Sequence, residues 1–119
     1  MSLKIIALSA ALAAASLPAL AEDMPMNMDH STGNHSPSSN AFAEANAKMH
    51  TDMAIQYSGD ADADFVRSMI PHHQGAIDMA RIELQYGKDP ELRKLAEDII
   101  KAQEAEIADM NAWLQARGK

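Results

Sequence analysis

The chain has no cysteine among its 119 residues, and this absence excludes two kinds of protein. Without thiols there is no disulfide framework, and there are no thiolates of the kind that structural zinc sites and iron–sulfur clusters use. Aromatic residues are also few, with two Phe, two Tyr and one Trp. A packed core must therefore come from Leu, Ile, Met and Ala.

Basic residues are scarce as well, because ten Lys and Arg stand against 17 Asp and Glu, for a formal net charge of −7. Nucleic acids and anionic membranes are bound by clustered Lys and Arg. We therefore expect neither as a partner. An acidic chain of this kind suits cations.

Long apolar runs are absent except in residues 5–20. This run follows Lys4 and ends in small residues at Ala21, just before the acidic Glu22, which is the pattern of a secretory signal peptide. A transmembrane helix is the competing interpretation, but two serines and a proline interrupt the run, and a span needs about 20 apolar residues. We predict a signal peptide in residues 1–21, cleavage after Ala21 and a periplasmic protein with no remaining membrane span.

Residues 22–40 are rich in Ser, Asn and Asp, and methionine is their only large apolar residue type. Such a segment buries too little apolar surface to fold, so we expect a disordered arm. The arm nevertheless carries side chains of the kind that ligate copper, namely Met24, Met26, Met28 and His30. The alternative is a polar linker whose methionines have no ligand role.

From Ala41 onward, apolar residues recur every three to four positions, which predicts an all-α domain over residues 41–117. Capping and stop signals divide this domain into the three main helices of a small up-and-down bundle. We expect the first helix over residues 40–57, the second from Asp60 or Asp62 to about Tyr86, and the third from Pro90, capped by Asp89, to about Arg117.

Pro71 lies inside the second predicted helix, where proline removes a main-chain hydrogen bond at a cost of about 3 kcal/mol or more. A kink is the expected result. A helix that breaks before Pro71 is the alternative.

The strongest functional signal is a short stretch of this helix that contains two thioethers and two imidazoles: Met69, His72, His73 and Met79. Thioether sulfur favours copper(I), and imidazole binds copper in either oxidation state. At about 100° per residue, His72 points with the methionines and His73 diverges from it, so the two histidines are not expected to chelate one ion. His73 then faces a second ion or a hydrogen-bond partner.

The first helix carries a matching set of ligand types in Met49, His50 and Met53. The i, i+4 spacing of the two methionines aligns their sulfurs along one face. We predict that Met69, His72 and Met79 form one half of a pocket and that the first helix supplies the other half. Core packing is the alternative for the methionines, because methionine often fills gaps in helical cores.

Glu106 lies on the face of the third helix that we expect to point inward, where an unpaired polar group costs free energy. Either it accepts a hydrogen bond from a histidine whose other nitrogen holds a metal, or it reaches water. Met110 follows one turn later on the same face and is a weaker candidate ligand.

The run from Met69 to Ala80, together with Asp64-Phe65 and the run from Met49 to Met53, strongly resembles the family catalogued as domain of unknown function 305. The resemblance covers about residues 40–117, and the paired histidines are its most specific element. It implies a ferritin-like helical bundle and, as in the CopM-like periplasmic members, copper binding that protects the cell from excess metal. The positions that match the family's motifs are Met49, His50, Met53, Met69, His72, His73 and Met79, with Met110 as a weaker match.

A ferritin-like fold also suggests the alternative of an enzyme with a di-iron centre, and such centres use Glu-x-x-His pairs. The positions three residues before His50, His72 and His73 hold Ala47, Met69 and Ile70, so this motif is missing. We therefore expect no enzyme and assign no catalytic residue.

These observations favour a periplasmic protein that sequesters or carries copper(I), and also copper(II) or silver(I), in copper tolerance or homeostasis. Expected partners are copper ions, periplasmic copper-transport or copper-delivery proteins, and a second copy that completes a four-helix bundle as a homodimer. A copper-dependent oxidase and a helical interaction module that binds no metal are the alternatives. Protons should compete at the imidazoles below about pH 6.5, whereas thioethers do not titrate there.

Overall fold

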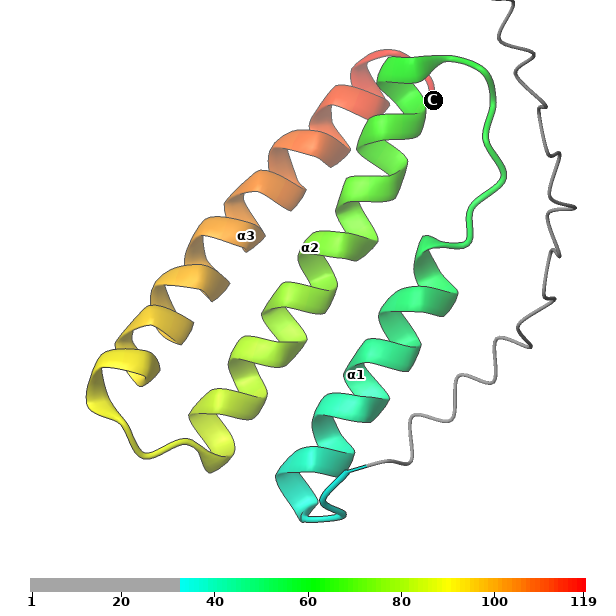
Figure 1. Ribbon diagram of the computed structural model, residues 1–119. Coiled ribbons are helices and arrows are strands. Elements are labelled where there is room, and N and C mark those ends of the chain that lie inside the picture. The colour runs from blue at the N-terminus through cyan, green and yellow to red at the C-terminus, as the bar shows by residue number, and fades with distance from the viewer. Residues whose placement is uncertain (1–32) are drawn as a thin grey trace, which may run out of the picture.

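The computed structural model describes residues 33–119, and these form three α-helices without any strand: α1 (Pro37–Met53), α2 (Ala61–Tyr86) and α3 (Pro90–Ala116) (Figure 1). The predicted all-α class is confirmed. The predicted signal peptide and the arm ligands Met24, Met26, Met28 and His30 lie outside the described residues.

Each helix begins at a side chain that accepts hydrogen bonds from the first free backbone N–H groups. The Asp60 carboxylate accepts from two such groups at the start of α2, and Asp89 does the same at the start of α3. Pro90 then occupies the first turn of α3, where its missing N–H costs nothing. Both predicted starts are confirmed.

The bounds predicted for the first helix are wrong at both ends. The Ser36 hydroxyl accepts a hydrogen bond from the Ser39 N–H, so α1 begins at Pro37, and residues 37–40 belong to this helix and not to the arm. At the other end α1 stops at Met53 instead of near residue 57. The loop that follows is held by Asp64, whose carboxylate accepts hydrogen bonds from the backbone N–H groups of Ser58 and Gly59.

Pro71 lies in the interior of α2, and the helix continues through it from Ala61 to Tyr86. The alternative of a helix that ends before Pro71 is therefore wrong.

The three helices lie side by side with α2 in the middle (Figure 1). Helices α1 and α3 each pack on α2, and no Cα atom of α1 approaches one of α3 within 8 Å. Successive helices run in opposite directions, which is the predicted up-and-down order. The domain is therefore a single layer of helices and not a closed bundle.

The buried core is small and consists of Ala63, Val66, Ile77, Ala80, Ile82 and Ala96, with His73 as its polar member. Gly75 is also buried, and a Cβ atom placed there would lie 2.5 Å from the Met49 Sδ atom. The missing side chain thus lets α1 approach α2 closely. Within residues 33–119, no helix has the length and apolar character needed to cross a membrane.

Candidate metal site

His73 is the buried histidine of the domain, with 10% of its side chain exposed, and its Nε2 lies 2.5 Å from the Glu106 Oε2. The pair joins α2 to α3. Glu106 shows features of both interpretations raised by the sequence, because it is hydrogen-bonded to a histidine and its side chain, which is 59% exposed, also reaches water. The histidine is His73 and not His72. A metal at the other ring nitrogen stays a prediction.

The second ring nitrogen of His73, Nδ1, is buried and has no hydrogen-bond partner among residues 33–119. A buried polar atom without a partner costs about 1–3 kcal/mol. Native structures seldom retain such an atom unless an ion, a water molecule or a chemical role accounts for it. This nitrogen is the first indication of a ligand site.

Two methionines lie beside the pair. Met69 and Met110 line the same hollow of about 280 Å³ as His73 and Glu106, and Phe65 and Asp109 complete its wall. Met69 precedes His73 by four residues, and Met110 follows Glu106 by four, so each helix presents two of these side chains one turn apart. The hollow therefore gathers two thioethers, one imidazole and one carboxylate from facing helices.

The other predicted ligands lie on the α1 side of α2. His50 is exposed and lines a second hollow together with Met79, while Met49 packs against Gly75. Met53 is the last residue of α1, is half-buried and lines neither hollow.

The six-residue pocket predicted from Met69, His72, Met79 and the three α1 ligands is not formed. Met69 and Met79 are ten residues apart, about 15 Å along a helix, and they line different hollows. His72 is exposed, and its ring centroid lies 6.0 Å from that of His73. The predicted divergence of the two histidines is confirmed, because one is buried against α3 and the other is not.

The grouping of His73 with Met69 and Met110 was not predicted from the sequence. The i, i+4 spacing of Met69 and His73 was the available signal, and the spacing of Glu106 and Met110 was its counterpart. Across residues 33–119, no three His, Asp or Glu side chains gather closely enough to hold a metal by themselves.

Residues 5–118 match the family described as "Domain of unknown function (DUF305)". The chain belongs to this family. Over 56 residues, this DUF305 chain is 43% identical to "Uncharacterized protein L153" of Acanthamoeba polyphaga mimivirus. The match covers 47% of the chain and 37% of the viral protein, so the chain spans only about a third of that relative's length. Neither name specifies a ligand or a reaction.

Proposed function

We propose that this DUF305 protein binds copper(I) between α2 and α3 through Met69, His73 and Met110, and that it sequesters or carries the metal in the periplasm. One observation carries the proposal. A buried imidazole, held at one nitrogen by Glu106 and without a partner among residues 33–119 at the other, lines the same hollow as two methionines.

The donor set favours a soft monovalent ion. Thioether sulfur selects copper(I), and by the same preference silver(I), over zinc or magnesium, and imidazole adds a nitrogen ligand that copper accepts in either oxidation state. With no cysteine in the chain, the methionines are its only soft donors.

Glu106 acts as a positioning residue in this proposal. Metal-ligating histidines usually donate their second N–H to a carboxylate or carbonyl, which fixes the ring orientation and raises the ligand's basicity. With Glu106 at Nε2, the nitrogen left for the metal is Nδ1. The tautomer that donates from Nε2 leaves Nδ1 as an acceptor with a free lone pair.

His50 and Met79 form a second, more exposed place for copper on the α1 side of α2. We assign the capture of copper ahead of the α2–α3 site to the arm ligands Met24, Met26, Met28 and His30. We also propose that the protein exchanges copper with copper-transport proteins and that it acts in copper tolerance. A ferritin-like relationship of its fold is part of the same proposal.

The proposal is tested by titrating the chain against a chromogenic copper(I) chelator under reducing conditions. Met69→Leu and Met110→Leu should each lower copper(I) affinity by about 10-fold or more, which is 1.4 kcal/mol per factor of ten. Leucine keeps the volume and apolar character, so the fold should be retained.

The matched control is Met53→Leu, because this half-buried methionine lines neither hollow. Its copper(I) affinity should equal that of the unmodified chain. If all three leucine variants bound copper(I) equally well, the α2–α3 site would be refuted.

A further inference from the structure

Helix α2 has two surfaces that α1 and α3 leave partly open, and they differ in character. At about 100° per residue, one surface carries Phe65, Met69, His72, Ala76, Met79 and Glu83. The opposite surface carries the polar residues Arg67, Gln74, Asp78, Arg81 and Gln85. The layer of helices is therefore amphipathic, with one apolar face and one polar face.

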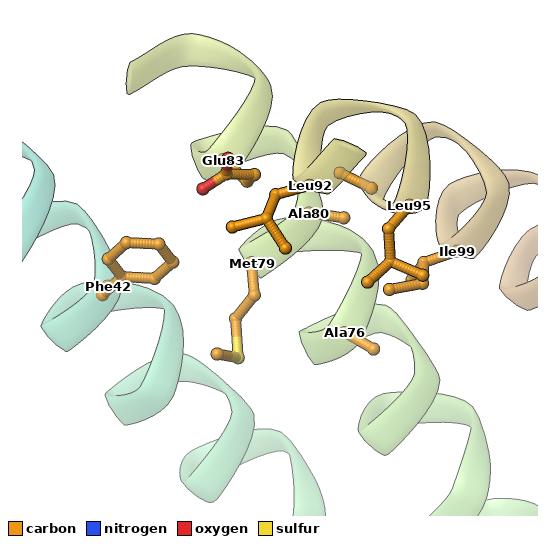
Figure 2. Close-up of a pocket in the computed structure, with 9 residues that line it drawn as sticks. Phe42, Ala76, Met79, Ala80, Glu83, Leu92, Leu95 and Ile99 are labelled. Atoms are coloured by element: carbon orange, nitrogen blue, oxygen red, sulfur yellow. The ribbon is translucent and has the colours of Figure 1, made fainter. Parts of the chain in front are cut away.

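The apolar face is continuous from α2 onto both neighbours. Figure 2 shows Phe42 of α1 pointing toward Met79, with Leu92 and Leu95 of α3 on the other side of a groove in which Glu83 is the one charged residue. Leu92 and Leu95 are each 52% exposed, and Phe65 farther along α2 is 62% exposed. Large apolar side chains gathered on one face in this way mark a surface that another structure covers.

The architecture points the same way. Stable domains place two or three layers of secondary structure around a core, and residues 33–119 form one layer with six buried apolar side chains. The missing second layer must match the first in width, because α1, α2 and α3 all contribute to the apolar face.

We propose that a second copy of this chain supplies that layer, so that two apolar faces pack against each other in a two-fold symmetric dimer. From the helix lengths and a spacing of about 9 Å, the face has a projected area of roughly 900 Å². A stable interface buries about 800 Å² per partner, so the face is large enough. Two-fold dimers pair the same surface of both copies and are the commonest oligomers.

A single helix from the chain's own residues 1–32 would not match this surface as well. A helix with its side chains is about 10–12 Å wide, which covers the groove between α2 and α3 and leaves the α1 part of the face open. The dimer does not depend on copper and is tested with chelator present.

Sedimentation velocity gives the first test, with both the full chain and the form that begins at Glu22. Both should be dimers at about 10 µM. Leu95→Glu should weaken the dimer by about 100-fold or more, because it buries an unpaired charge in the interface. Helix content by circular dichroism should stay unchanged, since Leu95 is half-exposed in the single copy.

Tyr57→Glu is the matched control. This residue is 71% exposed but lies in the connection between α1 and α2, and it lines none of the hollows on the apolar face. It should leave the dimer intact. A chain that is still monomeric at about 10 µM, or a dimer that Leu95→Glu does not weaken, would overturn the proposal.

Thiol alkylation of single-cysteine variants identifies what covers the face, since the chain has no cysteine of its own. Ala76→Cys places the thiol on the apolar face, and Gln85→Cys places one on the polar face as the control. A second copy predicts that alkylation at position 76 slows as protein concentration rises, while position 85 reacts at a constant rate. Protection at position 76 that persists at concentrations where sedimentation shows only single copies would assign the cover to the chain's own N-terminal segment and refute the dimer. The absence of protection at every concentration would also refute it.

Discussion

The Glu106 side chain is 59% exposed, yet its carboxylate holds the buried His73 ring through Nε2. Residues that orient metal ligands in this way typically change metal affinity by about 10–100-fold when replaced. Glu106→Gln should therefore weaken copper(I) binding by about 10-fold in a chelator competition. Glu104→Gln is the control, because Glu104 is 56% exposed and pairs with Arg81 away from the hollow. Equal affinities for the two variants would contradict the positioning role.

Replacing His73 distinguishes a metal ligand from a residue whose role is only structural. If its role were only structural, removing the imidazole would destabilise the fold. If Nδ1 is a metal ligand, its lack of a partner among residues 33–119 destabilises the metal-free protein by about 1–3 kcal/mol. His73→Leu removes this atom, so the metal-free variant should be at least as stable as the unmodified protein. Glu106 would then turn to water. Urea unfolding with chelator present measures this, and a loss of several kcal/mol would count against the assignment.

Asp64 gives the clearest pH dependence among the described residues. Hydrogen bonds from the backbone and hydroxyl of Ser58, followed by that from the backbone of Gly59, hold the pKa of this carboxyl below its ordinary value of 3.8. The carboxylate therefore stabilises the folded state above about pH 4, and this contribution is lost as the pH falls through the lowered pKa. Thermal unfolding should show a steeper loss of stability below pH 4 for the unmodified chain than for Asp64→Asn. Parallel profiles would contradict this.

At the scale of helices, Gly75 sets the spacing between α1 and α2. Alanine normally gains up to about 1 kcal/mol over glycine inside a helix. Here the new Cβ would meet the Sδ, Cγ and Cβ atoms of Met49, and the last of these cannot move without its backbone. Gly75→Ala should therefore destabilise the domain by about 1–3 kcal/mol. Adding Met49→Ala removes the clashing atoms, so the double variant should be more stable than the sum of the single effects. Additive effects in denaturant unfolding would argue against this contact.

Local signals in the sequence predicted most helix bounds. Asp60 and Asp89-Pro90 mark the starts of α2 and α3 because capping is a local interaction. Ser36-Pro37 carries the same signal for α1, but the polar composition around it led to a predicted arm that extended to residue 40. Helix α1 ends at Met53, and the connection after it is held by Asp64, which accepts hydrogen bonds from Ser58 and Gly59. Periodicity does not register such a contact between residues outside a helix and a side chain of the next one.

The candidate site was predictable only in part. The ligand types are read directly from the sequence, and the divergence of His72 from His73 follows from spacing along one helix. The link from Glu106 to a histidine was one of two alternatives that the sequence left open. The pairing of His73 with Met110 does not, because it depends on which side of α2 packs against α3. Periodicity gives the apolar face of a helix without specifying its neighbour, so His72 was grouped with Met69 in place of His73.

For the whole molecule, composition and architecture lead to one account. An acidic chain of net charge −7 without cysteine can hold a soft cation only through methionine and histidine. The open layer of three helices places those residues on or beside its apolar face. Copper binding and dimerisation can be tested separately, because copper binding depends on thioether sulfur and dimerisation depends on exposed leucine side chains.

Copper K-edge X-ray absorption would identify the atoms that coordinate the bound ion. The protein would be loaded with one equivalent of copper(I), in a chain whose three arm methionines and Met79 are replaced by leucine, so that neither the arm nor the second place for copper supplies sulfur. We predict a coordination shell of two sulfur atoms and one imidazole nitrogen, and loss of the sulfur scattering in the variant that also carries Met69→Leu and Met110→Leu. A shell of nitrogen and oxygen alone in the first protein, or sulfur scattering that survives in the second, would contradict the account.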